Sequence, residues 1–219
     1  MIAASALPPP PPPLPPARDF VRTVDNPWFP LEPGTVLVYK GEDEGVAARD
    51  VFRVTRAKKL IEGFRATVVF DRVFERGRVV ERTHDYYAQD RAGDVWYLGE
   101  DTATLKPDGR VDSREGTFRA GRDGARAGIF MPAHPRVGVG GWQEYYVGHA
   151  QDRYVVRSLN VHVRTPAARS NRAMRTQETT PLEPGVVDRK VYVRGIGTVR
   201  EQTVKGGNER YRLVAVRRS

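Results

Sequence analysis

Residues 83–101 read Thr-His-Asp-Tyr-Tyr-Ala-Gln-Asp-Arg-Ala-Gly-Asp-Val-Trp-Tyr-Leu-Gly-Glu-Asp. Two alternating, aromatic-rich segments flank a short polar connection, which is typical of a β-hairpin. Alternation predicts that one face of the first strand carries Thr83, Asp85, Tyr87 and Gln89. It predicts that one face of the second carries Asp94, Trp96, Leu98 and Glu100. This mixture of carboxylates, phenols and an indole suits the wall of a polar cavity, and it also fits a solvated sheet face.

Short β-branched and aromatic runs separated by turn residues continue along the chain. We expect strands at residues 35–40, 49–56, 64–74, 78–87, 94–98, 142–147, 153–164, 172–179, 188–193, 197–204 and 210–216. No segment sustains a helical apolar stripe, although residues 57–62 are compatible with a single helical turn before Gly63. The sequence therefore predicts an all-β fold, either an antiparallel β-barrel or a strongly curved sheet, lipocalin-like in general architecture.

The chain divides into a proline-rich leader and one β domain. Prolines at positions 8–13, 15 and 16 cannot donate to a sheet, so residues 1–20 are expected to be a disordered leader. Residues 21–219 are expected to form a single β domain. Within it, residues 112–141 are glycine-rich and weakly periodic, which predicts a long loop that is either functional or a simple exposed connection.

Composition limits the function classes. The formal net charge is +9 and the chain has no cysteine, so disulfides, zinc–thiolate sites and thiol nucleophiles are excluded. No window approaches the ~18 apolar residues of a membrane helix. Six arginines lie between Arg153 and Arg175 without an intervening acidic residue after Asp152. Nucleic-acid binding is not expected, because no aromatic residue after Tyr154 interleaves with these arginines to stack on bases.

Several motifs in order resemble an uncharacterised family of bacterial β-rich proteins that are often exported or lipid-anchored. The resemblance covers most of residues 25–216 and rests on the runs at 26–34, 85–90, 95–101, 120–125, 128–132, 143–146 and 181–185. It implies a β-rich fold and a periplasmic or secreted location, while a cytoplasmic location stays open. This chain has no lipid-attachment cysteine. The family has no assigned chemistry, so the resemblance implies no activity.

Motifs for the common site chemistries are missing from the sequence. The four histidines have no metal-ligand spacing, so no metal site is predicted, and no cofactor is expected. No G-x-S-x-G motif occurs. No helix follows a glycine-rich turn to bind phosphate.

A polar cavity within the barrel is the remaining hypothesis. The residues expected to line it are Asp85, Tyr87, Trp96, Glu100, Glu144, Tyr146, Glu178, Lys190 and Tyr192. Glu144, Asp85 and Lys190 are the catalytic candidates, because a buried carboxylate with a raised pKa can act as a general base. We expect Trp142 and Tyr146 to flank Glu144 on one face and Lys190 to be its counter-ion.

Three functions fit such a cavity. The first is binding of a small polar or aromatic ligand. The second is cofactor-free lyase or isomerase chemistry. The third is a structural exported protein without a small-molecule site. The sequence leaves the ligand and the oligomeric state open.

Two shorter patterns concern stability. Asn26-Pro27-Trp28-Phe29-Pro30 places two large rings where proline disfavours a helix, and we expect both rings to be buried at one end of the barrel. Pro30-Leu31-Glu32-Pro33-Gly34 recurs at residues 181–185. Each copy precedes a strand, and the Leu of each is expected to fix a tight turn to the core.

Overall fold

Fifteen β-strands make up most of the protein in a computed structural model that describes residues 9–218. Every strand pairing is antiparallel. Within the described residues the only helical element is a 3₁₀ turn, η1 (Ala17–Asp19). The predicted all-β fold is confirmed, and the expected strands lie close to the observed ones.

The strands are β1 (Val36–Asp43), β2 (Val46–Ile61), β3 (Phe64–Glu75), β4 (Arg78–Gln89), β5 (Val95–Leu105), β6 (Val111–Ser113), β7 (Phe118–Arg119), β8 (Arg126–Met131), β9 (Gly140–Trp142), β10 (Glu144–Tyr145), β11 (Arg153–Arg164), β12 (Arg169–Thr179), β13 (Val187–Val193), β14 (Gly197–Lys205) and β15 (Arg210–Arg217). They are hydrogen-bonded in the order β10-β8-β5-β4-β3-β2-β1-β15-β14-β13-β12-β11-β9, and β6 and β7 pair with β5.

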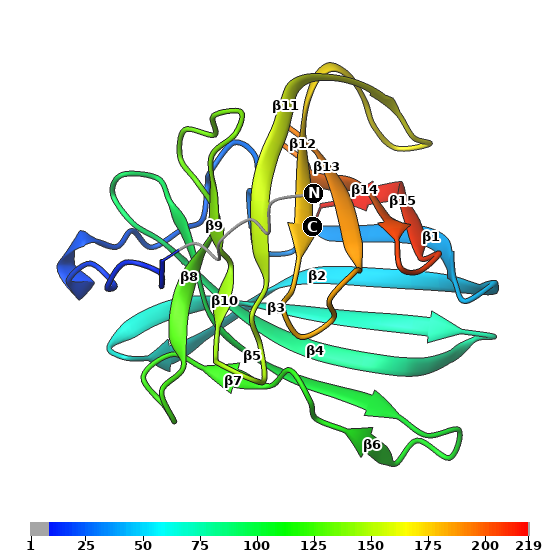
Figure 1. Ribbon diagram of the computed structural model, residues 1–219, viewed down its shortest axis with the longest axis horizontal. Helices are drawn as coiled ribbons and strands as arrows, with labels where there is room; N and C mark the ends of the chain where they lie inside the picture. The colour runs from blue at the N-terminus through cyan, green and yellow to red at the C-terminus, as the bar shows by residue number, and fades with distance from the viewer. Residues whose placement is uncertain (1–8, 219) are drawn as a thin grey trace, which may run out of the picture.

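The sheet curves into a nearly closed barrel (Figure 1). Its two ends, β9 and β10, are consecutive in the chain and are separated only by Gln143. β9 pairs with β11, whereas β10 pairs with β8. Gly128 on β8 permits the close approach at this junction, because a Cβ there would lie 2.3 Å from the Trp142 carbonyl oxygen. One short segment that changes partners therefore joins the two ends of the sheet.

Tight two-residue turns explain the long hairpins between β1 and β4. Glu44-Gly45, Glu62-Gly63 and Arg76-Gly77 each have positive φ at both residues, the backbone of turns whose twist matches that of paired strands. The expected helical turn at residues 57–62 is wrong. Residues 58–61 pair with β3, and β2 runs on to Ile61. Strand pairing here outweighs the weak local helix preference of the lysines.

The expectation of one long Gly-rich loop at residues 112–141 is also wrong, because part of this segment forms strands. It contains β7 and β8, and β8 pairs with both β5 and β10. These strands escaped prediction because they are short and because Gly128 interrupts the alternation of residues 126–131.

Apolar side chains gather on both sides of the sheet. Inside the barrel the main cluster includes Trp28, Phe29, Leu31, Tyr87 and Tyr97. A second cluster covers the outer face of β3, β4 and β5, where Val68, Ala88, Trp96 and Leu98 are buried. Residues from the N-terminal segment pack against this outer patch.

That segment was expected to lie outside the fold. Residues 1–8 are outside the described residues, but residues 9–20 contact the barrel (Figure 1, blue). The carbonyl of Pro9 accepts a hydrogen bond of 2.9 Å from Trp142 Nε1, and that of Pro11 accepts one from Arg126. Leu14 packs on the outer cluster, and the Phe20 ring lies 4.5 Å from the Phe64 ring. The segment therefore covers an apolar patch that would otherwise face solvent.

Deleting residues 1–20 should lower the melting temperature by at least about 4 °C. Exposing this patch removes on the order of 2 kcal/mol of apolar burial and hydrogen bonding, and each kcal/mol shifts Tm by about 2–4 °C in a chain of this size. Thermal unfolding followed by circular dichroism measures the shift. In the full chain, Phe20→Ala should reproduce part of the loss, whereas Val21→Ala, at a 37% exposed side chain, should not. An unchanged Tm in the deletion would mean that these contacts contribute nothing.

The Asn26–Pro30 motif is buried as expected. Trp28 and Phe29 are both in the main cluster. Asn26 positions them: its Oδ1 accepts a hydrogen bond from the Trp28 amide, and its Nδ2 donates to the Gly93 carbonyl. The repeated Pro-Leu-Glu-Pro-Gly motif is only partly equivalent. Both glycines have positive φ, but Leu31 is buried and Leu182 is 41% exposed, so only the first copy fixes its turn to the core.

Candidate functional site

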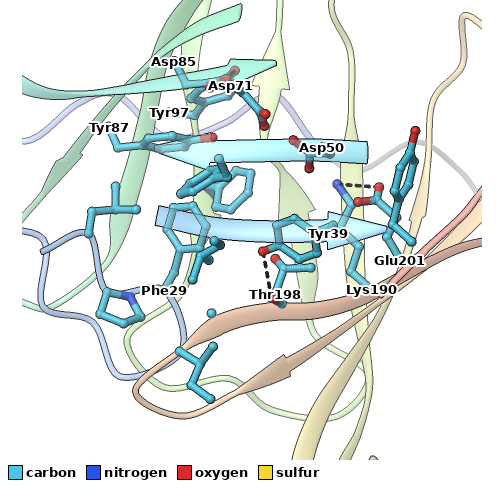
Figure 2. A pocket seen from close by; sticks show the side chains of 18 of the residues that line it. Phe29, Tyr39, Asp50, Asp71, Asp85, Tyr87, Tyr97, Lys190, Thr198 and Glu201 are labelled. Atoms are coloured by element: carbon cyan, nitrogen blue, oxygen red, sulfur yellow. Dashed lines mark hydrogen bonds and ion pairs between the residues drawn. The ribbon is translucent and has the colours of Figure 1, made fainter. Parts of the chain in front are cut away.

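A cavity of about 200 Å³ lies inside the barrel, and we call it the inner chamber (Figure 2). Its aromatic residues are Phe29, Tyr39, Phe52, Tyr87, Tyr97, Phe130 and Tyr211. Its acidic residues are Asp50, Asp71, Asp85, Glu144 and Glu201. Among the described residues that line it, Lys190 is the only basic one. Strands far apart in the sequence therefore converge on one polar, aromatic space.

A second cavity of about 500 Å³, the outer chamber, shares Asp50, Asp71, Asp85, Glu201 and Tyr211 with the inner one. It extends toward the β1–β2, β3–β4 and β14–β15 turns. There its walls add five more carboxylates, Asp43, Glu75, Glu81, Glu100 and Glu209. None of its described lining residues is basic. The lumen of this positively charged protein is thus strongly acidic.

The hairpin at residues 83–101 supplies part of both chambers. On β4, Asp85 and Tyr87 line the inner chamber and Thr83 lines the outer one, as expected of residues that share a face. Gln89 is buried but contacts Asp25 and Asn26 instead. On β5 a bulge changes the pattern: Tyr86 pairs with Gly99, but Tyr87 pairs with Tyr97. Leu98 is the extra residue. The bulge requires glycine, because Gly99 has φ 139° and a Cβ there would lie 2.4 Å from the Phe118 carbonyl oxygen.

The bulge makes two predictions wrong. Glu100 shares the lumen side with Tyr97 and not with Trp96. Trp96 lies in the outer cluster beneath the N-terminal segment, and its Nε1 donates a 2.9 Å hydrogen bond to Asp90 Oδ2. Strict alternation fails because one inserted residue reverses the faces of everything that follows it. Trp96 is therefore not part of the lumen.

Tyr97 connects two carboxyl groups. Its hydroxyl oxygen lies 2.6 Å from Asp85 Oδ1 and 3.0 Å from Glu100 Oε2. A phenol carries one proton and donates to one carboxylate at a time, so the second contact needs a proton on a carboxyl group. Burial and the charge of Asp71 raise the pKa of Asp85 to about 7. Burial and the charge of Asp85 raise the pKa of Glu100 well above its ordinary value. The three groups are therefore arranged to hold a shared proton near neutral pH.

Lys190 lies across the inner chamber from Asp85, beside Glu201 (Figure 2), and its ammonium is held by two carboxylates. Nζ is 3.1 Å from Glu178 Oε2 and 3.1 Å from Glu201 Oε1. Thr176 and Tyr192 donate hydrogen bonds to Glu178 Oε1. Burial lowers the pKa of Lys190, but the two carboxylates outweigh that effect and raise it. Lys190 therefore stays charged. Glu178 and Tyr192 were expected to line the cavity, but neither lines the inner or the outer chamber: Glu178 pairs with Lys190, and Tyr192 contacts Glu178.

Glu144 lines the inner chamber with Lys190 and Asp85, but the predicted surroundings differ. Lys190 pairs with Glu178 and Glu201, not with Glu144. Trp142 packs on Tyr145 at 5.2 Å and donates to Pro9. Tyr146 stacks on His149 at 4.4 Å and does not line either chamber. The chain bends at Gln143, between β9 and β10, which breaks the alternation that the prediction assumed. Burial and the charge of Asp152 raise the pKa of Glu144.

Several lumen residues were missed, notably Asp50, Asp71, Glu201, Tyr39 and Tyr97. A signal for two of them was present. Asp50 shares a strand face with Ala48 and Phe52, and Asp71 shares one with Val69 and Val73. A single carboxylate on the apolar face of a strand indicates a lumen residue, because an isolated buried charge is costly without a compensating role.

The stability of the protein should fall as the pH rises from 5 to 8. Asp85 and Glu209 have folded-state pKa values raised to about 7. A raised carboxyl pKa stabilises the fold below the unfolded pKa of about 4, and this contribution is lost as pH passes through the folded value. The expected loss is on the order of 2–3 kcal/mol, measured by urea unfolding across this range. Asp85→Asn should flatten the profile, and a stability that rises toward pH 8 would contradict the assignment.

The protein is therefore a nearly closed antiparallel β-barrel whose lumen is lined by acidic and aromatic side chains. No helix in the described part of the chain is long and apolar enough to cross a membrane. Among residues 9–218, no group of three or more His, Cys, Asp or Glu side chains is arranged to hold a metal ion.

The sequence matches no family model and no curated protein. Two solved structures are similar. One is a "putative exported protein with YmcC-like fold" from Bacteroides fragilis, with 14% identity, a TM-score of 0.49, and coverage of 87% of this chain and 99% of that chain. The other is a "putative lipoprotein" from Parabacteroides distasonis, with 11% identity, a TM-score of 0.46, and coverage of 87% and 98%.

Proposed function

We propose that this protein binds a small polar or aromatic ligand in the lumen of its barrel. One observation carries the proposal: Asp85, Tyr87, Glu144 and Lys190, from three different strands, line a single inner chamber that continues into the outer chamber. Chambers of this size, with aromatic walls and a few convergent polar groups, are typical of small-molecule sites. A purely structural core would be stabilised more by aliphatic side chains at these positions, since buried carboxylates are costly.

Ligand-observed NMR with a panel of polar and aromatic fragments tests this proposal. Ile196 lines the inner chamber from the β13–β14 turn and is half-buried, so Ile196→Trp should fill the chamber without disturbing a strand. Leu182→Trp, at an exposed position, is the matched control. We expect fragments to bind the natural protein and the Leu182 variant, and binding to weaken at least tenfold in the Ile196 variant. Equal binding in all three proteins would contradict a lumen site.

Proton-transfer catalysis is a second candidate, favoured by the Asp85–Tyr97–Glu100 contact. A carboxyl group with a pKa of about 7, hydrogen-bonded to a phenol, is suited to accept a proton from a bound substrate at neutral pH. Fragments that bind should then be screened for exchange of a C–H hydrogen with solvent deuterium. Asp85→Asn should abolish exchange and leave binding measurable. Exchange that survives this substitution would remove Asp85 from the role of base.

The resemblance at residues 26–34, 85–90 and 95–101 further supports a periplasmic or secreted location. Fractionation of the natural host, with detection of the untagged protein by antibody, tests this. Recovery in the cytoplasmic fraction alone would contradict it.

A further inference from the structure

We infer that the ligand of the lumen is a small amphipathic amine, in which an ammonium or guanidinium group is carried on an apolar or aromatic body. The inference rests on the proposed function and names the class of ligand. It follows from the placement of charge in the two chambers, from two buried carboxyl oxygens without a hydrogen-bond partner among the described residues, and from the aromatic wall beside them.

Three of the carboxyl groups shared by the two chambers, those of Asp50, Asp71 and Asp85, form one acidic wall. Figure 2 shows Asp50, Asp71 and Asp85 gathered along one side of the inner chamber. The outer chamber continues this wall with Glu81 and Glu100. The charged forms of these groups repel one another strongly because the surrounding protein has a low dielectric constant. A bound cation would remove this repulsion, whereas an anion would increase it.

The wall contains carboxyl oxygens that lack a partner. Asp50 Oδ1 and Asp71 Oδ1 have almost no exposed surface and no hydrogen-bond partner among the described residues. Asp50 is partly buried, and burial, followed by the charge of Asp71 and a hydrogen bond between the two carboxyl groups, raises the pKa of Asp50. Most buried polar atoms in proteins have partners, so each exception calls for an explanation. An ammonium or guanidinium donor placed between the two side chains would satisfy both atoms.

Among the described residues, no basic side chain forms an ion pair with Asp50, Asp71 or Asp85. Lys190 is the only basic residue among the described lining residues, and its ammonium is already held by Glu178 and Glu201. The arginines of β2 and β3 are on the other face of the sheet, where Arg49 and Arg72 pack on the Phe74 ring. The positive charge that this wall can bind must therefore come from a ligand.

The aromatic side of the inner chamber favours an organic cation over a metal ion. Phe29, Phe52 and Phe130 present apolar surface close to the acidic wall. Ca²⁺ and Mg²⁺ need several oxygens converging on one point, whereas these carboxyl groups are spread along a wall. An aromatic or alkyl body would pack on the rings while its charged group contacts Asp50 and Asp71.

Three matched probes distinguish the effect of the ligand's charge on binding from the effect of its aromatic ring. 2-Phenylethylamine, 2-phenylethanol and phenylacetate share one ring and differ in carrying a positive, zero or negative charge at neutral pH. Binding is measured by isothermal titration calorimetry with the full chain at low ionic strength. We expect the amine to bind at least tenfold more tightly than the alcohol and phenylacetate not to bind.

The double variant Asp50→Asn/Asp71→Asn tests the acidic wall. It removes two repelling carboxyl groups, so the ligand-free protein should be at least as stable as the natural one, while its affinity for the amine falls at least tenfold. Asp112→Asn is the matched control, because Asp112 is exposed and pairs only with Lys106 among the described residues. Its affinity for the amine should not change.

The outcomes distinguish this inference from the proposed function. Equal affinity for amine and alcohol, both lost in Ile196→Trp, overturns the inference and leaves the proposed function standing. Preference for phenylacetate, or displacement of the amine by Ca²⁺ at micromolar concentration, also overturns the inference. Binding of no probe, together with a negative fragment screen, overturns the proposed function itself.

Discussion

Lys190→Met should lower the free energy of unfolding by about 3–5 kcal/mol at pH 8. The substitution keeps most of the side-chain volume but removes the ammonium that lies 3.1 Å from both Glu178 and Glu201. Glu178 is 9% exposed and Glu201 30% exposed as side chains, so neither can recover full hydration in the folded protein. Urea unfolding, followed by tryptophan fluorescence, measures the loss.

Two comparisons isolate the charge pair from the change in packing. Lys106→Met removes an ion pair with Asp112 in which both side chains are about half-exposed, and it should cost less than about 1 kcal/mol. Adding Glu178→Gln and Glu201→Gln to Lys190→Met should restore most of the stability. The loss should also shrink toward pH 5, where the unpaired carboxyl groups take up protons. A loss that is the same at both pH values would show that packing, not charge, is responsible.

Trp28→Ala should cost about 3–5 kcal/mol, the range for removing a large aromatic side chain from a core. The Trp28 indole is 4% exposed and belongs to the main cluster inside the barrel. The Arg194 guanidinium stacks on it, 4.5 Å from the ring centroid. Trp28→Phe should retain more than half of the stability because it leaves a smaller cavity.

Leu60→Ala provides the matched comparison for Trp28, since Leu60 is a large apolar residue that is 69% exposed. Its substitution should change the unfolding free energy by less than about 0.5 kcal/mol. A Trp28→Ala protein as stable as the Leu60 variant would show that the motif at residues 26–30 does not hold the barrel together.

Strand positions were predictable because alternation is a local property. The expected segments 153–164 and 188–193 agree with β11 and β13 to within one residue. The pairing of Lys190 with Glu201 could also have been found, because these residues are directly opposite in the β13–β14 hairpin. What sequence patterns could not supply were the register shifts. The insertion at Leu98, in the β4–β5 hairpin, and the bend at Gln143, where β9 and β10 pair with different strands, each reverse the faces that follow.

The site prediction was partly wrong for the same reason, because register shifts change which face a residue occupies. Asp85, Tyr87, Glu144 and Lys190 do share a chamber, whereas Trp96 and Tyr146 were misplaced by the assumption of unbroken alternation. Gly99 within an aromatic strand was a usable warning, since glycine inside a strand often marks a bulge. The N-terminal segment could not be anticipated, because the outer patch that it covers exists only after β3, β4 and β5 have paired.

The partner exchange between β9 and β10 has a consequence for how the protein avoids aggregation. In most closed barrels a continuous hydrogen-bond ladder removes the sheet edges, and exposed edges recruit strands from other chains. Here the backbone through Gln143 joins the two edge strands covalently. A circular permutant beginning at Glu144 would keep every strand partner in the sheet and yet release both edges. Chain continuity through Gln143, together with its hydrogen bonds to Asp152 and Phe130, therefore helps to keep the two edges from pairing with other chains.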